Sequence, residues 1–398
     1  MTETKYWLWL SLALGSYSRK ITAVLEHFDS PEEIYNCKDI EAFKKIELLN
    51  PKDVVSLMDK STDKVNDVWE TCKNKGIRIL TFSSPMYPEN LANIYDPPYV
   101  LYVKCKEKYN LNDYLKIAMV GNRKATNLGL KITRELATDF AKAGALVVSG
   151  MAEGIDGAAN AATIDAGSIT VAVLGTGVDV CYPTFHDKLM ERICENGMVI
   201  SEFPPGTQPL KQNFPIRNRI ISGLCEATVV CEAPETSGSL ITADCALEQG
   251  REIYAVPGNI TEPTFVGTNN LIKQGAKIIT EANDLLKDFG DDYKKISLRN
   301  EIKKPDIISN EKKDEENAFV SISSKISAAS DDEATDFTKN LTQAEQLIME
   351  NLMLKPVHID ILCDKTGLSP NILNSNLTIL EMRGLVKSHP GKNFSLNV

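Results

Sequence analysis

The sequence predicts a doubly wound α/β domain at the centre of the chain, between a helical segment and a winged helix. Short apolar runs alternate with helical segments, which predicts a mainly parallel sheet covered on both faces. The runs are 116–120, 145–149, 169–174, 198–201, 227–231, 252–256 and 277–279. Glycines follow the runs at Gly121, Gly150 and Gly175. In open α/β sheets this carboxyl edge is where ligands bind.

Composition narrows the class of protein. A chain of 398 residues is too long for one ordinary core. Its net charge of −10 excludes a generally basic surface, so any nucleic-acid site must be local. The nine cysteines form no C-x-x-C pair and no metal-ligand spacing with the four histidines, which predicts a cytoplasmic protein without metal, cofactor or disulfides. No apolar run approaches the length of a membrane-spanning helix.

Residues 1–72 are expected to form a helical domain. Apolar residues recur at helical spacing, as at Ile21 and Val24, and Ser30 followed by Pro31 is typical of a helix start. The turn at 14–17 precedes Arg19 and Lys20. It fits a SAM-like or helix-hairpin-helix-like DNA-binding turn, but its single glycine favours a turn inside a packing domain.

The α/β domain is expected over residues 73–290, with the β-rich runs 76–82 and 99–104 as its extension. Residues 291–338 are charged and poor in aromatic residues, which predicts a disordered linker. Residues 339–398 return to helical periodicity and end in two strand-like runs, as in a winged helix. Its expected recognition helix, 369–383, has no basic residue before Arg383, so a docking or spacer role is as plausible as duplex-DNA binding.

Two arginine-bearing turns are the best candidates for a site. Arg217 and Arg219 flank Asn218 just ahead of an apolar helix, and Arg123 follows the first strand of the parallel series. Guanidinium and backbone N–H groups in such turns suit a phosphate. We expect the three arginines to converge on one anionic ligand. The alternative is a set of surface ion pairs.

The sequence lacks the motifs of several enzyme classes. There is no G-x-x-x-x-G-K-[ST], no G-x-G-x-x-G after a strand and no G-x-S-x-G, and the α/β domain holds a single histidine, His186. Five carboxylates fall at the carboxyl edge and suit either acid/base chemistry or the holding of backbone N–H groups and arginines. They are Glu153, Asp156, Asp179, Glu202 and Glu232.

An ordered series of motifs runs through residues 76–285: GNR at Gly121, SGMAEGID at Ser149, SEFPPG at Ser201, FPIRNRIISGL at Phe214 and EAPETSGSLITA at Glu232. In these motifs the chain resembles the DprA/Smf family of DNA-processing proteins. The resemblance implies an extended Rossmann-like fold that binds single-stranded DNA in a basic pocket. It also implies a cytoplasmic homodimer, not an enzyme, that protects incoming DNA and loads RecA onto it during natural transformation.

The resemblance also implies which residues line the pocket. They are Gly121, Asn122, Arg123, Ser149, Gly150, Gly175, Thr176, Gly177, Arg217, Asn218, Arg219, Ser237, Gly238 and Ser239. Phe185 is expected to stack on a base and Lys188 to add charge. Glu153 and Asn160 stand where family members usually show Arg and His, and both changes remove positive charge.

Two other functions compete with this one. The first is a nucleotide phosphoribohydrolase of the lysine-decarboxylase-like type acting on nucleoside monophosphates, which has a similar Rossmann domain. Those enzymes carry a PGGxGT turn before a catalytic Glu, whereas this chain reads EAPETSGSLITA. The second is transcriptional control through the winged helix, which its nearly uncharged recognition surface disfavours.

Overall fold

The computed structural model describes residues 1–15, 19–289, 347–349, 351–352, 357–366, 368, 373, 376–377, 380–381, 385–389 and 393–396. These residues belong to two compact units, one within residues 1–304 and one within 305–398. The expected linker lies outside the described residues, as does most of the expected recognition helix. The division into four domains therefore stays a prediction.

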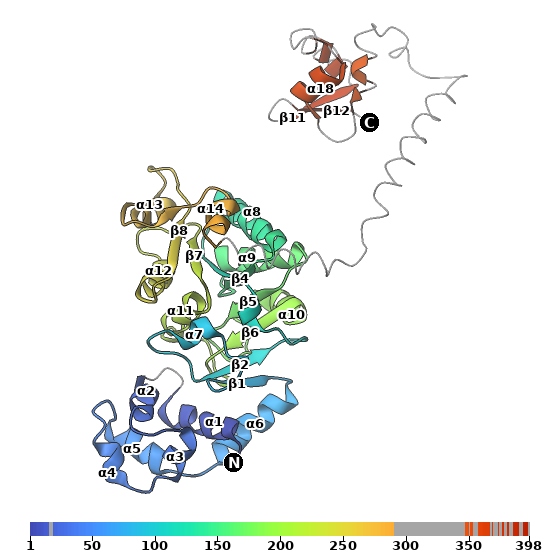
Figure 1. The fold of residues 1–398 in the computed structure, drawn as a ribbon. Helices are drawn as coiled ribbons and strands as arrows, with labels where there is room; N and C mark the ends of the chain where they lie inside the picture. The colour runs from blue at the N-terminus through green and yellow to red at the C-terminus, as the bar shows by residue number, and fades with distance from the viewer. Residues whose placement is uncertain are drawn as a thin grey trace. The chain divides into compact units, whose positions relative to one another are not determined.

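The chain begins with six helices, as the periodicity predicts (Figure 1). They are α1 (Glu3–Leu14), α2 (Arg19–Leu25), α3 (Pro31–Asn36), α4 (Ile40–Lys44), α5 (Pro51–Met58) and α6 (Asp63–Asn74). Ser30 caps α3 by accepting a hydrogen bond from the Glu33 N–H, and Ile21 and Val24 are buried. The turn at 14–17 is described only as far as Gly15, so its two interpretations stay open.

Nine strands then form one sheet in the order β1-β2-β6-β5-β4-β3-β7-β8-β9. They are β1 (Arg78–Thr81), β2 (Val100–Lys104), β3 (Lys116–Val120), β4 (Leu146–Ser149), β5 (Thr170–Val173), β6 (Gly197–Ser201), β7 (Ala227–Val230), β8 (Glu252–Ala255) and β9 (Lys277–Ile278). The pairs β1–β2 and β2–β6 are antiparallel and all others parallel. The strands β1 and β2 extend the sheet as predicted.

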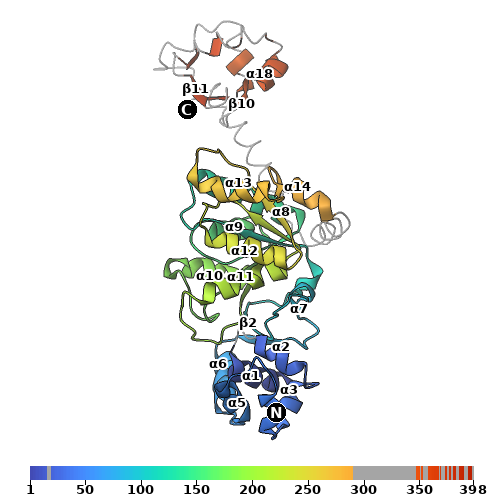
Figure 2. The same ribbon diagram turned by 90° about the vertical axis from the view of Figure 1, so that its left-hand side faces the viewer.

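Helices cover both faces of the sheet (Figures 1 and 2). One hydrophobic cluster joins the strands to residues of α7, α11, α12 and α13, and another joins them to residues of α8, α9 and α14. The helices are α7 (Glu89–Ala92), α8 (Asn127–Ala143), α9 (Ile155–Asp165), α10 (Asp187–Asn196), α11 (Asn213–Leu224), α12 (Gly238–Glu248), α13 (Val266–Lys273) and α14 (Ala282–Leu286), with 3-10 turns at Leu111–Asp113, Thr184–His186, Pro263–Phe265 and Lys287–Phe289. The predicted doubly wound fold is confirmed.

The strand order places a switch point between β3 and β7. From β3 the chain proceeds through β4 and β5 to one side, then returns to β7 on the other side. The two connections therefore diverge, which leaves a crevice at the carboxyl ends of β3 and β7. Both strands are fully buried, so the residues that follow them are held firmly.

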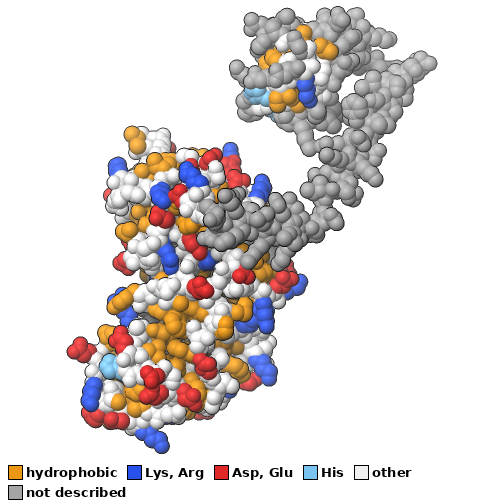
Figure 3. Space-filling view, viewed as in Figure 1, with side chains coloured by type: hydrophobic (Ala, Val, Ile, Leu, Met, Phe, Trp, Pro, Cys, Tyr) orange, Lys and Arg blue, Asp and Glu red, His pale blue; other side chains and the backbone are white. Residues whose placement is uncertain are grey.

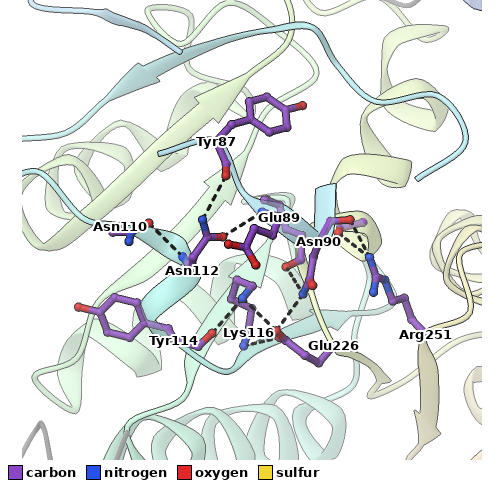
Figure 4. Close-up of polar contacts among 11 residues, drawn as sticks. Tyr87, Glu89, Asn90, Asn110, Asn112, Tyr114, Lys116, Glu226 and Arg251 are labelled. Carbon is purple, nitrogen blue, oxygen red and sulfur yellow. Dashed lines mark hydrogen bonds and ion pairs between the residues drawn. The ribbon is translucent and has the colours of Figure 1, made fainter. Parts of the chain in front are cut away.

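A polar network lies at the amino ends of the same strands, away from the crevice (Figure 4). The Lys116 ammonium, 4% exposed, lies 2.9 Å from the Glu226 carboxylate, which also accepts a hydrogen bond of 2.8 Å from the Asn90 amide. The Arg251 guanidinium donates to the Asn90 carbonyl. These contacts attach α7 to the sheet.

Figure 3 shows an area of hydrophobic side chains on the surface of the first unit. The N-terminal helices also pack against the α/β domain, because Trp7 of α1 stacks on Tyr99, with ring centroids 5.5 Å apart, and both belong to one core cluster. The helical segment and the sheet therefore share a core. Within the described residues, no helix has both the length and the apolar character needed to cross a membrane.

The second unit contains β10 (Val357–His358), α18 (Ile359–Thr366), β11 (Val386–His389) and β12 (Asn393–Leu396). The three strands form an antiparallel sheet in the order β10-β12-β11. Leu362, Leu373, Leu377 and Leu380 form its core with Val386. The helix, the core leucines and the hairpin fit the predicted winged helix.

Candidate functional site

A pocket of about 600 Å³ opens at the carboxyl ends of β3 and β7. It lies at the switch point, where the turn after β3 faces α11 and the start of α12. Half of the residues expected at the site line it. These are Gly121, Asn122, Arg123, Arg217, Asn218, Ser237, Gly238 and Ser239.

The turn after β3 is held in place by its neighbours. The Asn122 N–H donates to the Glu232 carbonyl at 2.7 Å, and the Asn122 amide donates to the Glu232 carboxylate at 3.0 Å. Gly154, with φ of 82°, packs so closely that a Cβ there would lie 2.3 Å from the Asn122 carbonyl oxygen. The exposed Arg123 side chain therefore projects from a turn that these contacts hold in place. Its guanidinium lies 5.3 Å from the centre of the Phe214 ring.

Arg217 lies on α11 and lines the pocket. It is 4% exposed, and its Nη1 donates to the carbonyls of Gly150, at 2.8 Å, and Val173. A Cβ on Gly150 would lie 2.2 Å from that nitrogen, so the glycine makes room for the guanidinium. Burial lowers the pKa of Arg217 to about 10, an effect opposed by Asp156, so the side chain stays charged at neutral pH. Burial raises the pKa of Asp156.

Arg219 does not join the other two arginines, so the expected convergence is wrong for this residue. Both Arg217 and Arg219 lie within α11 rather than ahead of it. Residues two apart on an α-helix point in nearly opposite directions. Arg219 is accordingly buried on the other side, with its Nη2 2.7 Å from Glu202 and its Nε 3.6 Å from Asp96. Burial raises the pKa of Glu202 to about 7.

The structure adds residues that the sequence reasoning did not assign. Lys124 and Lys211, both exposed, line the pocket, and so do the rings of Tyr182 and Phe214. The two rings lie 5.4 Å apart and tilted by 45°. Lys211 and Phe214 lie within six residues of Arg217 in the sequence, and this proximity is the signal that would have found them.

The other expected residues lie outside the pocket lining. Ser149 and Thr176 are buried and donate to the carbonyls of Met119 and Val180, so their hydroxyl groups support the loops. Gly175 and Gly177 allow close packing; a Cβ on Gly177 would lie 2.8 Å from the Gly206 nitrogen. These serine, threonine and glycine residues shape the loops at the carboxyl edge of the sheet and do not line the pocket. Their contact with a ligand stays a prediction.

Phe185 and Lys188 are also absent from the pocket lining. Phe185 is 65% exposed and contacts the edge of His186, whereas it is Tyr182, just before it, that faces the cavity. The 3-10 turn at Thr184–His186 directs the chain away after Tyr182. Stacking on Phe185 and charge from Lys188 remain predictions.

Four of the five carboxylates at the carboxyl edge accept hydrogen bonds from donors within the protein. Glu232 accepts from Thr126 and Asn122, Glu202 from Arg219, Asp156 from the Gly150 N–H and Asp179 from the Gly206 N–H; Glu153 is exposed. These four carboxylates thus hold backbone N–H groups, side-chain donors and an arginine in place. Asn160 is fully buried, donates to Thr170 and is not among the residues that line the pocket. Among the described residues, no cluster of His, Cys, Asp and Glu suits a metal ion.

Comparison with known proteins identifies related sequences and a related structure. The family model described as DNA recombination-mediator protein A matches residues 78–290, and the DprA winged helix domain matches 332–392. DNA processing protein DprA of Bacillus subtilis is 42% identical over 217 residues, 54% of this chain and 73% of the relative. Protein Smf of Synechocystis is 30% identical over 401 residues, 99% of this chain and 98% of the relative. DprA from Streptococcus pneumoniae has a similar structure, with a TM-score of 0.64 and 33% identity, covering 72% of this chain and 98% of that one.

Proposed function

This chain belongs to the DprA/Smf family, and on that premise we propose that its switch-point pocket binds single-stranded DNA. The observation that carries the proposal is that four cationic side chains line one pocket with a single carboxylate among them. The cations are Arg123, Lys124, Lys211 and Arg217, and the carboxylate is that of Asp156. In a chain with a net charge of −10, this local excess of positive charge suits a phosphate backbone.

The aromatic rings in the pocket support a single strand rather than a duplex. Tyr182 is 39% exposed and forms a tilted pair with Phe214, over which the Arg123 guanidinium lies. Unpaired bases stack on such rings, with about 1–3 kcal/mol per base. Paired bases are already stacked within a duplex. The neighbouring Asn218, Ser237 and Ser239 offer hydrogen bonds to base edges or phosphates.

The salt dependence of binding tests this proposal. Each phosphate neutralised on a single strand contributes about −0.7 to the slope of log K against log salt concentration, so four cations give a slope of about −3 at most. We expect oligo-dT to bind with a slope of about −2 to −3 in fluorescence anisotropy titrations. Replacing Lys124 and Lys211 together by Ala should reduce the slope by about half. A slope near zero would contradict phosphate neutralisation in the pocket.

We propose that the protein is a binder and not an enzyme. The edge carboxylates support this view, because four of them are engaged with donors in the protein. The alternative, a phosphoribohydrolase, predicts release of free base from nucleoside monophosphates. We expect no release above the uncatalysed rate when the full chain is incubated with each of the common nucleoside monophosphates and analysed by chromatography. Release at about 1 s⁻¹, a usual enzymatic rate, would favour the alternative.

The family relationship also motivates proposals about partners. We infer that the protein is a cytoplasmic homodimer that protects incoming DNA during natural transformation and loads RecA onto it. The pocket supports this inference, because a DNA strand bound at the carboxyl edge of the sheet leaves the bases outside the pocket accessible to RecA. Addition of the protein should then shorten the lag of RecA filament formation on single strands coated with a competing single-strand-binding protein.

A further inference from the structure

The amino end of α8 is the position where sheets of this topology bind phosphate. In dinucleotide-binding proteins the pyrophosphate lies at the start of the helix that follows the first strand, on unpaired backbone N–H groups. Here that strand is β3, because the chain passes from it through β4, β5 and β6 on one side and then crosses to β7, β8 and β9 on the other, which places the switch point beside β3. The helix that follows it is α8, which has Thr126 as its N-cap.

In this protein the amino end of α8 already holds an anion of the chain itself. The Glu232 side chain arrives from the end of β7 and is fully buried. Its two carboxylate oxygens lie 3.2 and 3.0 Å from the Thr126 nitrogen, and one of them accepts a hydrogen bond of 2.6 Å from the Thr126 hydroxyl. The Asn122 amide donates to the other at 3.0 Å. Every contact is a donor, which matches a carboxylate.

The helix also provides space for this carboxylate. Gly129 lies in the first turn of α8, and a Cβ there would be 2.0 Å from a Glu232 carboxylate oxygen. Any larger residue at 129 would therefore displace the carboxyl group. Two independent features, the set of donors and the missing side chain, thus fit an anion at this point.

We propose that Glu232 determines the ligand class of the pocket by occupying the phosphate position at the start of α8. A free nucleoside diphosphate or pyrophosphate would meet a buried negative charge where it needs N–H donors. The phosphates of a strand instead lie in the open pocket beside Arg123, whose turn Glu232 holds through Asn122. The second half of this inference rests on the proposed binding of single-stranded DNA; the first half does not.

Replacement of Glu232 by Ala tests the proposal. In calorimetric titrations with ADP and with inorganic pyrophosphate, we expect the variant to bind both ligands at least tenfold more tightly than the wild-type protein does. Oligo-dT affinity should fall about tenfold, because the turn that carries Arg123 loses its support. The matched control is Glu135→Ala, which removes an exposed carboxylate farther along α8, outside the pocket lining, and should change neither affinity. A folded Glu232→Ala variant without any gain in ADP or pyrophosphate affinity would overturn the proposal.

A pair of variants keeps the test decisive if Glu232→Ala folds but is too unstable for ligand titrations. Gly129→Ala alone should lower the melting temperature, because its methyl group displaces the carboxylate. In the Glu232→Ala background the same change should raise it, since the methyl group then fills the vacated space. Equal losses in both backgrounds would contradict the proposed packing. If wild-type protein bound no oligo-dT, the proposed function would fail, while the pyrophosphate titration would still decide the role of Glu232.

Discussion

Replacing Arg217 by Ala is expected to weaken oligo-dT binding about 100-fold. The guanidinium is held by Gly150 and Val173 through Nη1 and by Asn218 through Nε. Among the described residues its Nη2 has no hydrogen-bond partner, and the side chain lines the pocket. A charged donor fixed in this way contributes about 3 kcal/mol to a phosphate contact, and each 1.4 kcal/mol corresponds to a factor of ten in affinity.

The control for Arg217 separates a lost contact from a lost fold. Arg217→Lys keeps the positive charge but not the planar fork, so we expect an intermediate loss of about tenfold. Thermal melts of both variants should be recorded beside the titrations. Wild-type affinity in a folded Arg217→Ala protein would contradict a phosphate contact at this residue.

Replacing Arg219 by Ala should instead lower the free energy of unfolding by about 3–5 kcal/mol. Glu202 is 2% exposed and would lose the guanidinium that lies 2.7 Å away, leaving a buried carboxylate without its charged partner. The folded fraction should bind oligo-dT with wild-type affinity, because Arg219 is absent from the pocket lining. Urea unfolding combined with anisotropy titrations measures both effects.

The loss caused by Arg219→Ala should depend on pH. Burial already raises the pKa of Glu202 to about 7, and removal of Arg219 raises it further. A carboxyl group with a raised pKa in the folded state favours folding at low pH and disfavours it as pH rises. The deficit should therefore be smaller at pH 5 than at pH 8. A deficit that is equal at both values, or a loss of oligo-dT affinity, would contradict the assignment of Arg219 to the core.

Much of the α/β architecture could be predicted because its signals are local. The buried strands read as apolar runs, and β3 begins and ends where the sequence predicts. The carboxyl edge followed from topology, since parallel strands end at one edge. The turn carrying Arg123 was found because it directly follows a buried strand.

The composition of the pocket was harder to predict because it depends on the direction of side chains. Placing Arg217 and Arg219 in a turn implied convergence, whereas the helix α11 separates them. Similarly, the sequence did not predict that Gly150 makes room for the Arg217 guanidinium. The turn after Tyr182 contacts residues distant in the sequence: the Tyr182 ring pairs with Phe214, and His186 lies 2.9 Å from the Met151 carbonyl. No pattern in the sequence reports such packing.

Ultraviolet cross-linking of oligo-dT followed by peptide mapping tests the central claim most directly, because it reports where the bases lie. Thymine bases stacked in the pocket should give adducts at Tyr182 or Phe214, and these should disappear in the Arg217→Ala variant. Adducts confined to residues outside the pocket, for instance to the second unit within 305–398, would contradict the account.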